Sequence, residues 1–201
     1  MIDYKKAGHF SADEQKMYLW FRNAKDRFLM PLSCFLAKRR IKPDMLSLSG
    51  LLMMPFFVYF FSYNPWIAFF FLILNLLFDG LDGSVARVLQ TPSAKGEFTD
   101  KAVDYFCFAI VYLSFVYFGL LSPFWAAVLL LNYAVMQSLV IFGQMMDVKL
   151  FPILRPKLVI YLFFLIWLIS GQNFFDPLLV LLSVYLFVSN YFIISKIRCS
   201  L

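Results

Sequence analysis

Residues 79–104 read DGLDGSVARVLQTPSAKGEFTDKAVD and lie between two long apolar runs. The segment contains four regularly spaced aspartates, namely Asp79, Asp82, Asp100 and Asp104. On helices the first two are three residues apart and the last two are four residues apart, so each pair lies on one face of its helix. Because charged side chains are costly in or beside a bilayer, a cluster of this kind among apolar segments predicts a functional site.

The composition is that of an integral membrane protein. Of the 201 residues, 62% are hydrophobic and 20% aromatic, and the mean hydropathy is +0.77. A soluble domain of this size is nearer half apolar, so the composition excludes a soluble globular protein. The three cysteines, Cys34, Cys107 and Cys199, show neither metal-ligand nor disulfide spacing, and we interpret them as apolar packing residues.

Six apolar segments approach the length of a membrane-spanning helix. They cover residues 46–63, 65–87, 100–120, 123–146, 153–170 and 177–195. Pro55 predicts a kink in the first segment. Residues 11–40 predict an amphipathic helix at the membrane interface. The sequence therefore predicts an all-α membrane protein, with an N-terminal cytoplasmic or interfacial segment (1–45) and one domain of six transmembrane helices (46–201).

The basic residues predict how the chain is oriented in the membrane. Ten of the eighteen precede the first apolar segment, and the others flank the second and fourth connections or follow the last segment. The positive-inside rule then places both termini and the acidic segment on the cytoplasmic side. The net charge of +6 indicates attraction to anionic lipid headgroups. No nucleic-acid-binding signature accompanies it, so we expect no nucleic-acid partner.

Only Arg87 is certain to lie near the four converging carboxylates. Their uncompensated negative charge would be energetically costly unless bound cations neutralised it. An all-oxygen ligand set selects Mg²⁺ or Mn²⁺, and four carboxylates are enough for two ions, which suits displacement at phosphorus. Gly83, Ala86 and Gly96 place little or no side chain on the helix faces that carry the aspartates, so that a bulky ligand can approach the backbone. Arg87 is either a phosphate ligand or a positive-inside anchor.

The spacing D-x2-D-G-x2-A-R-x8-G-x3-D-x3-D resembles the signature of the CDP-alcohol phosphotransferases at all eight fixed positions. The segment 41–47 is similar to the entry of that family into its first span, with Asp44 in place of Asn and Ser47 in place of Thr. The resemblance implies a phospholipid-synthesis enzyme that transfers a phosphoryl-alcohol group, such as phosphatidyl from CDP-diacylglycerol, to an acceptor hydroxyl. CMP is then released.

The resemblance also implies roles for individual residues. Asp79, Asp82 and Asp100 would bind two divalent cations, Mg²⁺ or Mn²⁺, and Asp104, also near the metals, would be the general base for the acceptor hydroxyl. The nucleotide-binding candidates are Gly83, Ala86, Arg87, Gly96, Asp44 and Ser47. A homodimer in a lipid membrane is implied as well.

The acceptor alcohol is less well specified. Lys149, Arg155 and Lys157 are candidate ligands for an acceptor phosphate, or they are plain membrane-surface charge. Gly50 stands where relatives that use glycerol phosphate often carry Arg, and the G-K-x-K-T pattern of many phosphatidylglycerophosphate synthases is absent. These two features weigh against glycerol 3-phosphate.

Three other functions remain open from the sequence. An intramembrane prenyltransferase also binds pyrophosphate through Asp-rich helices, but it would need a second acidic cluster. A cation transporter would use the carboxylates as its ion site, and it would show acidic or broken-helix features in other segments. Asp147 and Asp176 do not supply these features. The third alternative is a catalytically silent scaffold.

Overall fold

The computed structural model describes residues 27–91, 94–146, 148 and 156–199, and the secondary-structure elements in these ranges are all helices. Residues 27–38 form a helix that belongs to the expected interfacial segment, whose residues 11–26 lie outside the described ranges. The helices that follow are α2 (Pro43–Leu52), α3 (Met54–Phe61), α4 (Pro65–Val88), α5 (Ala94–Tyr117), α6 (Pro123–Met145), α7 (Pro156–Ser170) and α8 (Phe175–Arg198).

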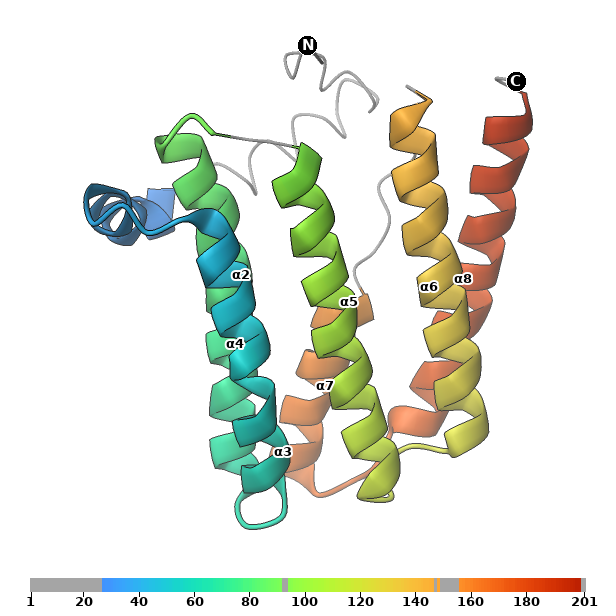
Figure 1. Ribbon diagram of the computed structural model, residues 1–201. Coiled ribbons are helices and arrows are strands. Elements are labelled where there is room, and N and C mark those ends of the chain that lie inside the picture. Colours follow the sequence, from blue (N-terminus) through green and yellow to red (C-terminus); the bar gives the residue numbers. More distant parts are fainter. Residues whose placement is uncertain (1–26, 92–93, 147, 149–155, 200–201) are drawn as a thin grey trace.

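The helices run side by side as one bundle (Figure 1). Helix α4 packs against α2 and α3, α5 packs against α2 and α6, and α6 pairs with α8. Helix α7 also contacts α4 and begins part-way along the bundle rather than at its end (Figure 1). This arrangement brings α2, α4, α5 and the first turn of α7 around one region of the interior.

The first apolar segment is divided into α2 and α3 by a break at Met53, two residues before Pro55. Proline has no backbone N–H and its ring clashes with the preceding helical turn, so a helix is interrupted or bent there. The helix is therefore interrupted near Pro55, and the segment that contains the interruption extends over 19 residues, Pro43–Phe61.

The helix that carries Asp79 and Asp82 ends in a tight turn. Helix α4 ends in a Schellman motif, in which the N–H of Thr91 donates to the carbonyl of Ala86 and the N–H of Gln90 donates to that of Arg87. Gln90 takes the left-handed conformation that this motif requires, with φ of 54°. The end of α4 and the start of α5 lie at the same end of the bundle (Figure 1).

Four described helical segments are long and apolar enough to cross a membrane. They are Pro43–Phe61, Pro65–Val88, Pro123–Gly143 and Phe175–Arg198. All six predicted segments contain a helix, but six spans are not confirmed. Helix α5 begins six residues earlier than predicted and includes charged residues, and α7 has only 15 residues. At 1.5 Å per residue α7 is about 22 Å long, which is shorter than a bilayer core.

The interior and exterior of the bundle are both apolar. Phe61 stacks with Phe118, Phe164 and Trp167, and these rings join α3 to α7 and to the residue after α5, at the end of the bundle away from the aspartates. Large apolar side chains such as Phe187 point outward, with 67% of its surface exposed. Contiguous apolar exterior is unfavourable in water and suits lipid. The structure thus agrees with an integral membrane protein.

Candidate active site

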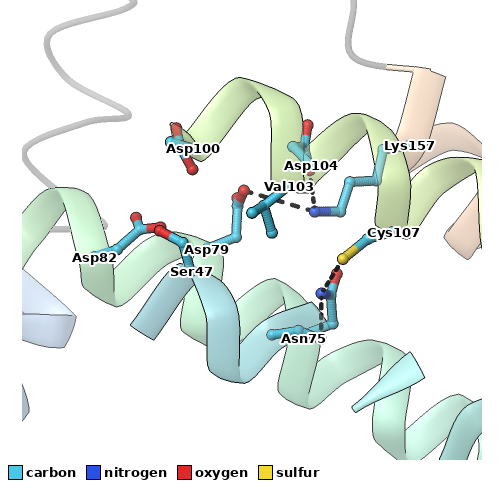
Figure 2. A pocket seen from close by; sticks show the side chains of 10 residues that line it. Ser47, Asn75, Asp79, Asp82, Asp100, Val103, Asp104, Cys107 and Lys157 are labelled. Carbon is cyan, nitrogen blue, oxygen red and sulfur yellow. Dashed lines mark hydrogen bonds and ion pairs between the residues drawn. The ribbon is translucent and has the colours of Figure 1, made fainter. Parts of the chain in front are cut away.

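The four aspartates of the sequence motif meet at a single pocket. Asp79 and Asp82 come from α4, and Asp100 and Asp104 come from α5. Ser47 of α2 also lines this pocket, and so does Lys157 from the first turn of α7. Figure 2 shows the carboxylates on two facing helices, with Lys157 reaching in from the α7 side. The i, i+3 and i, i+4 spacings therefore bring the acidic side chains together as predicted.

Asp82 is the most tightly held of the four carboxylates. Its Oδ2 accepts a hydrogen bond of 2.6 Å from Ser47 Oγ, and its Oδ1 accepts one from the backbone N–H of Gly83. Only 5% of Asp82 is exposed. Asp100 of α5 lines the same pocket as Asp82, so carboxylates from two different helices share this space. Carboxylates that lie close together need a cation or a shared proton to offset their repulsion.

Lys157 provides the positive charge that is buried in this pocket. Its ammonium pairs with Asp104 Oδ1 and lies 3.6 Å from Asp79 Oδ1. The Lys157 side chain is only 5% exposed, against 20% and 21% for the two carboxylates. From the sequence, Lys157 is one of the basic residues that flank the fourth connection. In the structure it is an interior residue that bridges the two acidic helices.

The pocket remains strongly acidic after this pairing. Four carboxylates and one ammonium give a formal charge of −3, which is −4 from the aspartates and +1 from Lys157. Among the described residues, no three His, Cys, Asp or Glu side chains are arranged so that they would hold one metal ion as they stand. The ammonium of Lys157 lies between Asp79 and Asp104 and contacts both.

Of the six nucleotide-binding candidates, Ser47 lines the pocket and the other five do not. Arg87 is exposed and its Nη2 donates to Ser84 Oγ at 3.1 Å. A Cβ added at Gly83 would meet only the Arg87 guanidinium, at 3.4 Å, so the surface beside Gly83 is open apart from a flexible side-chain end. Ala86 and Gly96 are half-buried, and Asp44 lies half-buried in the first turn of α2. None of these five lines the pocket.

The expected acceptor ligands are only partly visible. Lys149 and Arg155 lie outside the described residues, so their prediction is neither supported nor opposed. The pocket also contains Asn75 and Cys107, for which the motif gave no role. Asn75 lies four residues before Asp79, on the same helix face, and a polar residue at that position of an apolar helix is the signal that would have found it.

The sequence profile of the CDP-alcohol phosphatidyltransferase family matches residues 40–193. The chain belongs to this family. Its members are transferases of the CDP-alcohol phosphotransferase type, which act in phospholipid biosynthesis.

A protein of Aquifex aeolicus (strain VF5), described as uncharacterized, is 35% identical to the chain over 88 residues. These residues are 42% of this chain and 44% of the Aquifex protein, so the match spans less than half of that relative. The matched relative therefore adds no statement about substrate, and the family supplies the class of reaction alone.

Proposed function

We propose that this member of the CDP-alcohol phosphatidyltransferase family transfers a phosphatidyl or similar phosphoryl-alcohol group from a CDP-alcohol to an acceptor hydroxyl. The observation that carries the proposal is the pocket between α4 and α5, where four carboxylates and one ammonium leave a formal charge of −3. An excess of this size in a largely apolar protein calls for cations. CDP-diacylglycerol is the proposed donor, because the exposed apolar side chains of the protein suit a lipid environment.

The ligand set fits divalent cations in its chemistry. All four acidic side chains offer oxygen, the donor that Mg²⁺ and Mn²⁺ prefer, and all four line one pocket. Asp79, Asp82 and Asp100 would hold two such ions, with Asp104 beside them. When bound, the ions would neutralise pyrophosphate oxygens and stabilise the departing CMP. The contact between Lys157 and Asp79 would have to open for this to happen.

Asp104 is the proposed general base. It takes the proton of the acceptor hydroxyl as that oxygen forms its bond to the phosphorus attached to the lipid alcohol. The bond from this phosphorus to the bridging oxygen breaks, and CMP leaves with the electron pair. A base must lie within hydrogen-bond reach of the proton that it removes, and Asp104 lines the pocket that the other carboxylates share.

Lys157 gives one indication about the acceptor. Its ammonium lies directly beside Asp104, the group that would meet the acceptor hydroxyl. An acceptor that carries a phosphate or carboxylate near its hydroxyl would place that anion against Lys157. We therefore propose an anionic small alcohol as acceptor, with Lys149 and Arg155 as further candidate ligands. We also propose that the pocket and both termini face the cytoplasm and that the protein forms a homodimer.

The test is CMP release by the purified full-length protein in lipid vesicles. CDP-diacylglycerol, CDP-choline and CDP-ethanolamine are each combined with serine, glycerol 3-phosphate, inositol, inositol phosphate or diacylglycerol, with Mg²⁺ or Mn²⁺ present. We expect one donor and acceptor pair to release CMP, and we expect Asp104→Asn to abolish that release in a folded protein. Metal-ion flux without CMP from any pair would instead favour the transporter.

Asp176→Asn is the matched control for Asp104→Asn. It makes the same chemical change in α8, where the Asp176 carboxylate accepts a 2.9 Å hydrogen bond from the N–H of Ser122, outside the acidic pocket. We expect this variant to release CMP at the parental rate. Near-parental CMP formation by Asp104→Asn would remove Asp104 as the base.

A further inference from the structure

A second layer of polar groups lies one helical turn below the four aspartates. Each of the four helices that line the pocket contributes one group to it. On α4 the group is Asn75, four residues before Asp79, and on α5 it is Cys107, three residues after Asp104. On α2 it is the carbonyl of Gly50, and on α7 it is the hydroxyl of Tyr161. The same four helices therefore form the deeper layer and the acidic layer above it.

The side-chain amide of Asn75 connects all four helices. Its Nδ2 donates to the carbonyl oxygen of Gly50 at 3.2 Å and to Cys107 Sγ at 3.3 Å. Its Oδ1 accepts from Tyr161 Oη at 3.4 Å. Figure 2 shows Asn75 beneath the aspartates, with its amide directed at Cys107. The amide thus uses both donor hydrogens and its acceptor, which neither a carboxylate nor an apolar side chain can do.

The space around this amide is closed. Only 3% of Asn75 is exposed, and Cys107 and Tyr161 are 1% and 4% exposed. A Cβ added at Gly50 would lie 3.1 Å from Asn75 Nδ2, so α2 and α4 approach here as closely as a glycine permits. A buried polar group that lost its partners would have no water to replace them, so the network constrains the helices strongly.

We propose that Asn75 is a positioning residue that fixes the register of α2, α4, α5 and α7, and through them the relative placement of the four aspartates and Lys157. The inference rests on the proposed function for its catalytic consequence. A displacement of about 1 Å at a reacting group can cost about a hundredfold in rate. A partner that orients metal-ligating carboxylates typically contributes 10- to 100-fold in metal affinity or activity.

The experiment measures Mn²⁺ binding and CMP release for the purified full-length protein and its variants in the same vesicles. Asn75→Leu removes all three hydrogen bonds, and Tyr161→Phe removes one. We expect Asn75→Leu to lower the Mn²⁺ affinity about tenfold or more and to lower kcat, with the donor KM little changed. Tyr161→Phe should show a smaller loss of both. Cys107→Ser, which keeps an acceptor, should lose less than Cys107→Ala.

The matched control is Asn190→Leu. Asn190 is also a buried asparagine, 6% exposed, and its Nδ2 donates to the backbone carbonyl of Asn132 at 3.0 Å, joining α8 to α6 outside the pocket. We expect this variant to lower the thermal stability but to keep the parental Mn²⁺ affinity and kcat. All measurements are made below the unfolding temperature of the least stable variant.

The possible outcomes separate this inference from the proposed function. Parental Mn²⁺ affinity in Asn75→Leu, or a loss no larger than in Asn190→Leu, overturns the role of Asn75. A parent that binds Mn²⁺ but releases no CMP from any pair overturns the proposed function, and the affinities of the variants still decide the inference. A parent that binds no Mn²⁺ contradicts both.

Discussion

Lys157→Met is the substitution that most directly tests the electrostatics of the pocket. Methionine has a similar length but no charge, so the change leaves Asp79 and Asp104 without their buried partner and moves the formal charge of the pocket from −3 to −4. Two opposite charges 3.6 Å apart interact by about 4 to 5 kcal/mol at an effective dielectric constant of about 20.

The expected loss of folding stability is smaller than this Coulomb energy. Breaking a buried ion pair by removing one partner costs about 3 to 5 kcal/mol. The two carboxylates are 20% and 21% exposed, so the lower end, about 3 kcal/mol, applies to the metal-free protein. At about 2 to 4 °C per kcal/mol for a chain of this size, we expect the unfolding temperature in EDTA to fall by about 6 to 12 °C.

The same substitution should strengthen metal binding. In the parent, the ammonium and a divalent ion compete for Asp79 and Asp104, whereas the methionine side chain competes with nothing. A gain of about 1.4 to 3 kcal/mol corresponds to an affinity for Mn²⁺ higher by about ten- to a hundredfold. Mn²⁺ should therefore raise the unfolding temperature of the variant by more degrees than it raises that of the parent.

The assay is thermal unfolding of the purified protein in detergent, with EDTA or with increasing Mn²⁺, together with a direct Mn²⁺ titration. Lys157→Arg keeps the charge and should resemble the parent in both. Lys38→Met makes the same chemical change at an exposed lysine of the helix 27–38 and should change neither quantity. Equal Mn²⁺ affinities in Lys157→Met and the parent would refute the competition, and an unchanged unfolding temperature in EDTA would refute the buried pair.

Three further substitutions probe other parts of the site. Ser47→Ala removes the 2.6 Å hydrogen bond to Asp82. A hydrogen bond to a charged acceptor contributes about 1.5 to 3 kcal/mol, so a titration should show Mn²⁺ binding weakened about tenfold or more. Ser49→Ala should leave Mn²⁺ binding unchanged. Gly83→Ala meets only a flexible side-chain end, so we expect an unchanged unfolding temperature and a several-fold higher donor KM; an unchanged KM would place the nucleotide elsewhere. Pro55→Ala should lower kcat by straightening the break after α2, and parental kcat would show that this break does not position the site.

Much of the site followed from the sequence because its determinants are local. The spacing of Asp79 and Asp82, and of Asp100 and Asp104, depends only on helical periodicity. Two helices joined by a short connection run antiparallel, so the two pairs are expected near the same end of the bundle. Pro55 interrupts its helix through its own covalent structure. These features need no knowledge of the rest of the bundle.

Other features depend on tertiary packing and were not accessible in the same way. Lys157 follows Arg155 and Pro156 in a basic stretch, which is typical of a membrane-surface segment. Whether its side chain is exposed depends on how deeply α7 starts in the bundle. The role of Asn75 likewise depends on three groups that are 25, 32 and 86 residues away along the chain. The residue pattern within a single helix cannot predict such long-range contacts.

The burial of Lys157 and the contact between Tyr161 and Asn75 both depend on where the short helix α7 begins. A helix of 15 residues that began at the end of the bundle would place Lys157 among surface charges and Tyr161 beside the aspartates. Because α7 begins part-way along the bundle (Figure 1), Lys157 lies level with Asp104 and Tyr161 lies level with Asn75. Helix α7 is therefore too short to cross a bilayer core, but it supplies the buried ammonium of Lys157 and the Tyr161 hydroxyl that contacts Asn75. A change that shifted α7 by one turn would separate Lys157 from Asp104 and Tyr161 from Asn75 together, so the two contacts should be gained or lost as a unit.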